Sequence, residues 1–240
     1  MAVLSHDFTG SRVLVVGGTR GVGNTIATSF RDAGATVTVT GTMMLRELYD
    51  TDLAGLGYET VNLARQESMD HLVGVTDDID ILVLAAGCAL PHGLPDSERS
   101  FIGEAVRSGV LGPMFLTTRL RLKLGQSNAP GGGCVISTGA VARWLELASG
   151  DPEDAVDELA LTTARAAHNW AGIGVRVNAI MEPARSLLPR QVGASASRGA
   201  GGYDTLTRTQ LSIDESVAAM SLFLATIDAA RLTGQTLHLN

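Results

Sequence analysis

The sequence predicts an α/β fold, a doubly wound parallel sheet within a single domain, and three observations support this prediction. Strand-like runs alternate with helix-like runs along the chain, which is the pattern of repeated βαβ units. A glycine-rich turn, GGTRGVG, separates the first expected strand from the first expected helix. The length of 240 residues suits one core of ordinary size, so we expect residues 1–240 to form one domain.

The expected strands are short runs of apolar and β-branched residues, and the expected helices carry apolar residues at helical spacing. The strands cover residues 12–16, 35–40, 59–61, 79–84, 134–137, 175–180 and 236–239. The helices cover residues 21–30, 101–124, 152–170 and 214–226, with Asp214 as the N-cap of the last one. Residues 184–212 show neither pattern, and a loop of that length is usually functional, so we expect a lid over a bound substrate.

The composition excludes several classes of protein. The chain is 45% hydrophobic and 18% charged, which is typical of a folded globule, and its net charge of −7 argues against a nucleic-acid partner. It contains no apolar run long enough to span a membrane and no recognisable signal peptide. Cys88 and Cys134 lack the spacing of metal ligands, and apolar surroundings favour small buried thiols. We therefore expect a cytoplasmic protein without a metal.

The glycine-rich turn is the strongest functional signal in the sequence. Gly17, Gly21 and Gly23 lie between the end of the first strand and the start of the first helix. Glycine permits a tight turn and lets backbone N–H groups approach a pyrophosphate, toward which the helix directs its positive end. A purely structural turn is the alternative. The position of the turn favours a dinucleotide phosphate site.

The spacing of these glycines resembles that of the short-chain dehydrogenase/reductase family, and the resemblance covers essentially the whole chain. The runs LVLAAG, GVRVNAI and LTGQTLHL stand where that family has its fourth, sixth and last strands. The resemblance implies a Rossmann-type sheet, a nicotinamide cofactor and a homo-oligomer, either a dimer or a tetramer. The cofactor-binding positions that it implies are Gly17, Thr19, Arg20, Gly21, Val22, Gly23, Thr42, Asn62, Leu63, Ala85, Ala86, Gly87, Pro183 and Arg185.

The end of the second strand bears on which nicotinamide cofactor is bound. An NAD-preferring site has a carboxylate there for the ribose hydroxyls, whereas this chain has Gly41, Thr42 and Met43. Arg20 lies in the phosphate loop, where the NADP-binding members of the family often carry a base. A solvated Arg20 without a ligand is the alternative. We predict NADPH as the cofactor.

The resemblance also implies four catalytic residues, Asn, Ser, Tyr and Lys, and the sequence departs from this set. Counting back from Asn178, the Tyr position falls on Pro152 and the Lys position on Val156. An error of register does not explain this, because none of the three tyrosines is followed four residues later by lysine and Lys123 is the only lysine. The usual acid catalyst is therefore predicted to be missing.

Other residues are candidates for part of the catalytic work. The Ser position maps to Thr138, with Ser137 just before it, and the Asn position maps to Gly109. Thr138 could hydrogen-bond a substrate carbonyl or cap its own backbone. His92, in the loop after the fourth strand, and Tyr203, in the expected lid, could donate a proton, although a solvated histidine and a packing tyrosine are the plainer interpretations.

Two functional hypotheses follow. In the first, the protein is an NADPH-dependent ketoreductase whose substrate supplies the proton from a hydroxyl beside its carbonyl, as an aromatic polyketide can. The loss of the catalytic set together with a long lid resembles the atypical ketoreductases of aromatic polyketide (angucyclinone-like) antibiotic pathways. In the second, the protein binds NADP(H) without catalysis and acts as a sensor or scaffold. The intact phosphate loop and the apolar lid favour the enzyme, with an aromatic ketone as its small-molecule partner.

Overall fold

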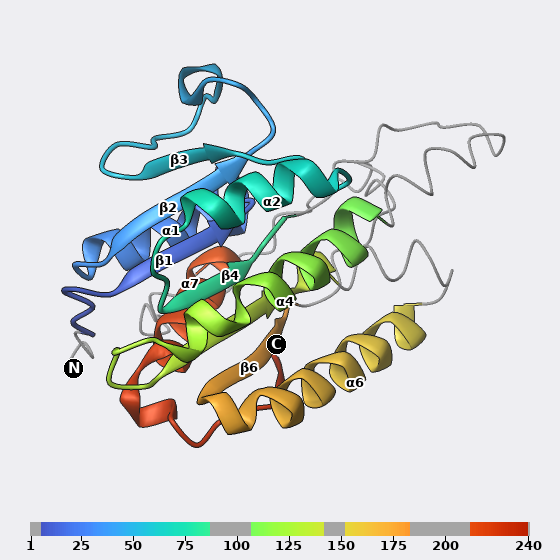
Figure 1. Ribbon diagram of the computed structural model, residues 1–240. Helices are drawn as coiled ribbons and strands as arrows, with labels where there is room; N and C mark the ends of the chain where they lie inside the picture. The colour runs from blue at the N-terminus through green and yellow to red at the C-terminus, as the bar shows by residue number, and fades with distance from the viewer. Residues whose placement is uncertain (1–5, 87–106, 142–151, 183–211, 240) are drawn as a thin grey trace, which may run out of the picture.

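The computed structural model describes residues 6–86, 107–141, 152–182 and 212–239, and within them seven strands form one parallel sheet in the order β3-β2-β1-β4-β5-β6-β7 (Figure 1). The strands are β1 (Arg12–Val16), β2 (Thr36–Gly41), β3 (Gly57–Thr60), β4 (Ile81–Leu84), β5 (Gly133–Thr138), β6 (Val175–Met181) and β7 (Thr236–His238). The order reverses between β1 and β4, where ligands bind in sheets of this kind. The prediction of a doubly wound parallel sheet is confirmed.

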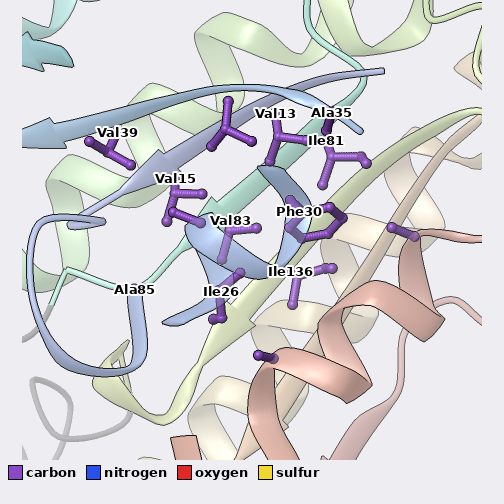
Figure 2. Packing of buried hydrophobic residues seen from close by; sticks show 14 of the residues in the cluster. Val13, Val15, Ile26, Phe30, Ala35, Val39, Ile81, Val83, Ala85 and Ile136 are labelled. Atoms are coloured by element: carbon purple, nitrogen blue, oxygen red, sulfur yellow. The ribbon is translucent and has the colours of Figure 1, made fainter. Parts of the chain in front are cut away.

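Helices cover both faces of the sheet (Figure 1). Helices α1 (Gly21–Asp32) and α7 (Ile213–Ala225) pack against each other on one face, and α2 (Gln66–Val75), α4 (Gly112–Gly125) and α6 (Pro152–Trp170) lie on the other. Alternate residues of β1 serve the two layers, because neighbouring side chains of a strand point to opposite faces. Val13 and Val15 pack with Ile26 and Phe30 of α1 (Figure 2), whereas Leu14 packs under α2 and α4.

Several expected boundaries needed correction. Helix α2 was not anticipated, because only Met69 and Leu72 of its ten residues are buried and the apolar pattern is faint. The N-cap of α7 is Ser212 rather than Asp214, because the Ser212 hydroxyl accepts the N–H of Glu215 and the Glu215 carboxylate accepts the N–H of Ser212. In the central helical stretch, a π-helical turn (Arg107–Leu111) precedes α4.

Some expectations lie outside the described residues. These are the lid at 184–212 apart from Ser212, the part of the central helix before residue 107, and Cys88. Cys134 is fully buried on β5, and burial raises the pKa of its thiol to about 11, as expected of an inert core cysteine. In the described ranges no helix has the length and apolarity to cross a membrane, and no group of His, Cys, Asp or Glu could hold a metal.

The amino ends of β1 and β4 are joined through one buried carboxylate. Asp80 accepts hydrogen bonds from the backbone N–H and the Nε of Arg12 at 2.8 and 3.1 Å, and from the Ser127 hydroxyl at 2.6 Å. Burial would raise the pKa of Asp80, but these donors outweigh it and lower the pKa below its ordinary value. The network holds the end of the sheet opposite the glycine-rich turn.

Candidate functional site

The glycine-rich turn has the geometry that the sequence predicts for a phosphate loop. Gly17 has a φ of +82°, and an added Cβ there would overlap the backbone of Ala86. At Gly23 an added Cβ would overlap the carbonyl oxygen of Gly17, so the start of α1 packs directly against the end of β1. Gly21 has a φ of +52° and faces open space, which leaves room for a ligand above the turn.

The first turn of α1 has unpaired donors for an anion. Its N-cap, Arg20, makes no side-chain capping bond, and no acidic residue lies in the first turn. The backbone N–H groups at a helix start have no partner within the helix, so an anion can accept from them and is favoured by the helix dipole. The only amide side chain of this turn, Asn24, donates to the carbonyl groups of Gly18 and Asp52 and so links the glycine-rich turn to the segment around Asp52.

A cavity of about 490 Å³ opens above this turn and crosses the carboxyl ends of the central strands. Its lining combines the phosphate loop, the end of β2, the end of β4 and the end of β5. The lining residues are Gly17, Thr19, Arg20, Gly21, Val22, Gly23, Thr40, Gly41, Thr42, Met43, Tyr49, Ala85, Ala86, Thr138, Ala140, Glu182 and Asp214. The space above Gly21, the open helix start and the elongated lining fit a dinucleotide whose pyrophosphate lies over the turn.

The side chain of a tyrosine that the sequence did not single out lies beside the end of β2. The Tyr49 hydroxyl oxygen accepts hydrogen bonds from the backbone N–H of Thr42 at 2.8 Å and of Met43 at 3.1 Å. Tyr58 donates its own hydroxyl to the Met43 carbonyl. Burial alone would raise the pKa of Tyr49, but the Met43 and Thr42 donors and the Tyr58 hydroxyl lower it to about 8. Burial and the neighbouring Tyr49 raise the pKa of Tyr58 to about 12.

Two predicted adenine-side residues do not line this cavity. Asn62 is exposed and its side-chain oxygen accepts the N–H of Ala64, so it closes its own turn before α2. Leu63 is buried and lines a different hollow between α2 and α4. Their predicted cofactor contact is therefore not supported by the lining of the main cavity. Gly87, Pro183 and Arg185 lie outside the described residues.

The two hydroxyls at the end of β5 face opposite sides of the sheet. Thr138 lines the main cavity, and its hydroxyl donates to the Leu84 carbonyl at 3.3 Å and accepts the Ala140 N–H at 3.4 Å. Ser137 instead lines a smaller, apolar cavity of about 140 Å³ between α4 and α6. Adjacent residues of a strand cannot both reach one site. Ser137 is thus separated from the main cavity, and Thr138 is the hydroxyl that β5 presents there.

The family's tyrosine and lysine have no counterpart near Thr138 in the described residues. Pro152 begins α6, and Val156 packs beside Leu159, Ala179 and Met181 in a small apolar cluster. Lys123 donates from its Nζ to the carbonyl groups of Val73 and Thr76, where it caps the end of α2.

The Tyr49 hydroxyl lies beside the end of β2, and Tyr58 lies within β3 with its ring next to that of Tyr49. The two candidate proton donors, His92 and Tyr203, fall outside the described residues. The described part of the cavity therefore holds neither of the usual partners for a carbonyl oxygen.

Sequence reasoning missed three ionisable side chains that line the cavity. Glu182 follows β6, and its Cδ lies 3.8 Å from the position that a Cβ would take at Gly139. Asp214 enters from the first turn of α7, and Tyr49 from the segment after β2. The capping pattern of Ser212 with Glu215 was visible in the sequence and would have moved Asp214 from the cap into the helix. Glu182 and Tyr49 had no comparable signal.

The sequence also matches a known protein family, in agreement with the fold and the geometry of the glycine-rich turn. A family model for enoyl-(acyl carrier protein) reductases, which are short-chain dehydrogenases, matches residues 16–240. The chain belongs to the short-chain dehydrogenase/reductase family. This match confirms the family that the glycine spacing and the strand runs resemble.

Individual relatives support a reductase of this family. A 3-oxoacyl-(acyl-carrier-protein) reductase FabG of Rickettsia typhi is 34% identical over 83 residues, which is 34% of this chain and 34% of that protein, so the match spans about a third of the curated relative. A solved structure, provisionally assigned as a betaketoacyl-ACP reductase, is 26% identical over 98% of both chains with a TM-score of 0.73. These likenesses agree with membership of the short-chain dehydrogenase/reductase family.

A third comparison concerns the fold alone. The NADP active-site complex of Pseudomonas aeruginosa RhlG is 20% identical to this chain, with a TM-score of 0.69 over 98% of this chain and 96% of that one. At this identity the likeness extends to the arrangement of strands and helices and carries no substrate or cofactor to this member of the family.

Proposed function

We propose that this protein is an NADPH-dependent ketoreductase that reduces a carbonyl of an aromatic polyketide (angucyclinone-like) in antibiotic biosynthesis without the usual tyrosine and lysine. The observation that carries the proposal is the continuity of the cavity from the phosphate loop to Thr138, while the positions that counting back from Asn178 assigns to the tyrosine and lysine are Pro152 and Val156 of α6. An intact phosphate loop, beside a cavity whose described lining lacks the usual tyrosine and lysine, favours another source for the proton.

NADPH rather than NADH is supported by the charges at the end of β2. Gly41, Thr42 and Met43 present two backbone N–H donors and no carboxylate, and Arg20 lies at the same side of the cavity. A 2′-phosphate would meet donors and a cation there, and no negative side chain among these residues would repel it. NADH would gain nothing comparable from Arg20.

The residues of the chain have distinct tasks in this proposal. The N–H groups at the start of α1 would hold the pyrophosphate, and Thr138 would orient the substrate carbonyl by turning its hydroxyl away from Leu84. A bound NADPH would supply the hydride for the carbonyl carbon. The carbonyl oxygen then needs one proton, which a hydroxyl next to the carbonyl on the substrate can donate.

The proposed substrate class follows from that proton. A ketone with an adjacent phenol already carries an internal hydrogen bond to its carbonyl oxygen, which polarises the carbonyl and stabilises the developing alkoxide. Aromatic polyketides have this arrangement. An isolated ketone or a β-ketoacyl thioester has no such donor and would depend on a protein acid.

A sensor or scaffold without catalysis is the second candidate, and one observation favours it. The Thr138 hydroxyl is engaged with its own backbone, through Leu84 and Ala140, rather than free for a substrate. Binding of NADP(H) would then be the whole activity. The two candidates differ in whether any ketone is consumed.

The test follows NADPH oxidation with pairs of aromatic ketones that differ only in a hydroxyl beside the carbonyl, and with a β-ketoacyl thioester. Turnover of the hydroxylated ketones alone is expected. Turnover of both members of each pair would contradict substrate-assisted protonation. If Glu182→Gln then lost the turnover of both ketones, Glu182 would be identified as the acid. Turnover of the thioester alone would give the protein the substrate class of its acyl-carrier relatives. Tight NADPH binding without any turnover would favour the sensor.

A further inference from the structure

The Tyr49 hydroxyl lies at the place where the proposed cofactor would be discriminated. Tyr49 lines the same cavity as the phosphate loop, and its oxygen is held by the N–H groups of Thr42 and Met43. Gly41 makes this arrangement possible, because an added Cβ there would overlap the Tyr49 hydroxyl. The phenol therefore fills a position at the end of β2 that any other residue at 41 would obstruct.

This position is suited to an anion. Two backbone N–H groups converge on one oxygen, and the guanidinium carbon of Arg20 lies 5.4 Å from the centre of the Tyr49 ring. The N–H groups of Met43 and Thr42, with the Tyr58 hydroxyl, outweigh burial and lower the pKa of Tyr49 to about 8, so the surroundings stabilise negative charge on its oxygen. A phosphate would bring the charge that a neutral phenol lacks.

The segment before Tyr49 is largely exposed, whereas the Tyr49 ring packs against the hydrophobic core and lies 6.0 Å from the ring of Tyr58. Met44 and Leu48 are 86% and 56% exposed, and Tyr49 itself is only half-buried. Its anchors are polar contacts farther along, such as Arg46 to the carbonyl groups of Leu53 and Leu56. Movement of the hydroxyl therefore costs its two hydrogen bonds and part of the ring contacts with the core, Tyr58 and Arg20.

We propose that the Tyr49 hydroxyl occupies the 2′-phosphate subsite as a displaceable stand-in, so that Tyr49 is a specificity-determining residue that limits the preference for the phosphorylated dinucleotide. The proposal rests on the proposed cofactor, because it concerns the adenosine end of the same cavity. A 2′-phosphate displaces the phenol and takes over the N–H groups of Thr42 and Met43 with charge-assisted hydrogen bonds, which are about twice as strong as neutral ones. A ribose hydroxyl cannot replace both bonds and leaves the phenol in place.

The experiment isolates the adenosine end with two probes, adenosine 2′,5′-bisphosphate and adenosine 5′-monophosphate, measured by calorimetry. Tyr49→Phe keeps the ring beneath Arg20 and removes the hydroxyl. Leu48→Ala is the control, because Leu48 lies on the same segment, is 56% exposed and does not line the cavity. The loss of one competing hydrogen-bonding group should tighten bisphosphate binding to Tyr49→Phe about fivefold and change monophosphate binding less than about twofold. In the control both affinities should stay within about twofold of the unsubstituted protein.

Three results would overturn the proposal. Weaker bisphosphate binding to Tyr49→Phe would mean that the hydroxyl binds the phosphate. An equal change for both probes would mean that the hydroxyl only stabilises the loop. Unchanged binding of both probes would mean that the hydroxyl does not occupy the subsite. If Tyr49→Phe fails to fold, the tyrosinate absorbance of the unsubstituted protein gives the answer. Saturating bisphosphate should move the tyrosine that ionises near pH 8 toward the ordinary value of 10.0, and an unmoved titration would contradict displacement.

The affinities for NADPH and NADH distinguish a wrong cofactor assignment from a wrong role of Tyr49. If the unsubstituted protein binds NADH more tightly than NADPH and Tyr49→Phe reverses that order, NADPH is wrong as the resident cofactor while the role of Tyr49 stands. If NADPH is preferred and the substitution leaves the preference unchanged, the cofactor stands and the role of Tyr49 is wrong.

Discussion

The Thr138 hydroxyl donates a hydrogen bond of 3.3 Å to the carbonyl oxygen of Leu84, which joins the ends of β5 and β4 at the cavity. A bond of this length is weak, so a substrate carbonyl could compete for the same proton. If Thr138 orients the substrate, Thr138→Val should lower kcat/KM for the hydroxylated ketone about tenfold and leave the Kd of NADPH unchanged.

The matched variant for this prediction is Thr138→Ser, which keeps the hydroxyl and should retain most of the activity. Equal loss in both variants would show that the methyl group, packed in a fully buried position, matters more than the hydroxyl. Full activity in Thr138→Val would leave Thr138 with only its bonds to the backbone of Leu84 and Ala140.

The affinity for adenosine 2′,5′-bisphosphate should depend on pH through Tyr49. The pKa of Tyr49 is lowered from 10.0 to about 8 in the folded protein, so a phenolate holds the subsite above that pH and repels a phosphate. Arg20 faces the Tyr49 ring and Asp50 and Asp52 lie on the same segment, while the pKa of Tyr58 is raised to about 12, above this range.

Affinity should therefore be level from about pH 7, where the phosphates of the probe are ionised, to pH 8 and fall by up to about tenfold per pH unit between 8 and 10, where the displaced phenol would itself ionise. Calorimetric titrations across this range give the slope. Tyr49→Phe should abolish it, and a slope that survives in that variant would assign the effect to another group.

Gly23→Ala should disable the phosphate loop. The added methyl would overlap the Gly17 carbonyl and lie 3.2 Å from the Ala85 Cβ, so the start of α1 would have to move away from β1. We expect NADPH binding to weaken by at least about tenfold and the free energy of unfolding to fall by about 1–3 kcal/mol. Fluorescence titration and urea unfolding measure the two effects.

Gly74→Ala is the control for that substitution. Gly74 lies in α2 with no neighbour within 4 Å of an added Cβ, so alanine should stabilise the helix. The expected gain is about 0.5–1 kcal/mol with NADPH binding unchanged. A weakened affinity in Gly74→Ala would mean that α2 and the loop are coupled, and the effect at Gly23 would no longer report local overlap.

The sheet could be predicted from the sequence because its central strands are buried on both faces and read as continuous apolar runs. The runs RVLVV and VRVNAI stand out against their surroundings, and the glycines of the phosphate loop carry a requirement that no other residue meets. Helix α2 could not be predicted in this way, because so few of its residues are buried that no clear apolar pattern appears in the sequence.

The site was less predictable because its side chains meet through contacts that no local pattern encodes. Tyr49 reaches back to Thr42 and Met43 across a turn, and its aromatic ring gives no sign in the sequence of facing the cavity. The separation of Ser137 from Thr138 was predictable in principle, because adjacent residues of a strand face opposite sides. Glu182 could be predicted to line the cavity only if the end of β6 were known.

The carboxylate of Asp80 should make the fold sensitive to acid. Its pKa is lowered from 3.8 in the folded protein, so its contribution to the free energy of unfolding is complete above that value and is lost as the pH falls through the folded-state pKa. Asp80→Asn should reduce the free energy of unfolding at neutral pH by about 2–3 kcal/mol, because Arg12 and Ser127 lose a charged acceptor. Urea unfolding at neutral and acidic pH measures this difference.

The comparison for Asp80 is Asp32→Asn, which breaks the exposed pair of Asp32 with Arg31 and should cost less than about 1 kcal/mol. The difference between Asp80→Asn and the unsubstituted protein should shrink in acid, because both then carry a neutral group at this position. An undiminished difference in acid would mean that the introduced amide disturbs packing rather than charge. Ser127→Ala, which removes one donor and keeps the carboxylate, should lie between the two at about 1 kcal/mol, since a single hydrogen bond to Asp80 is lost.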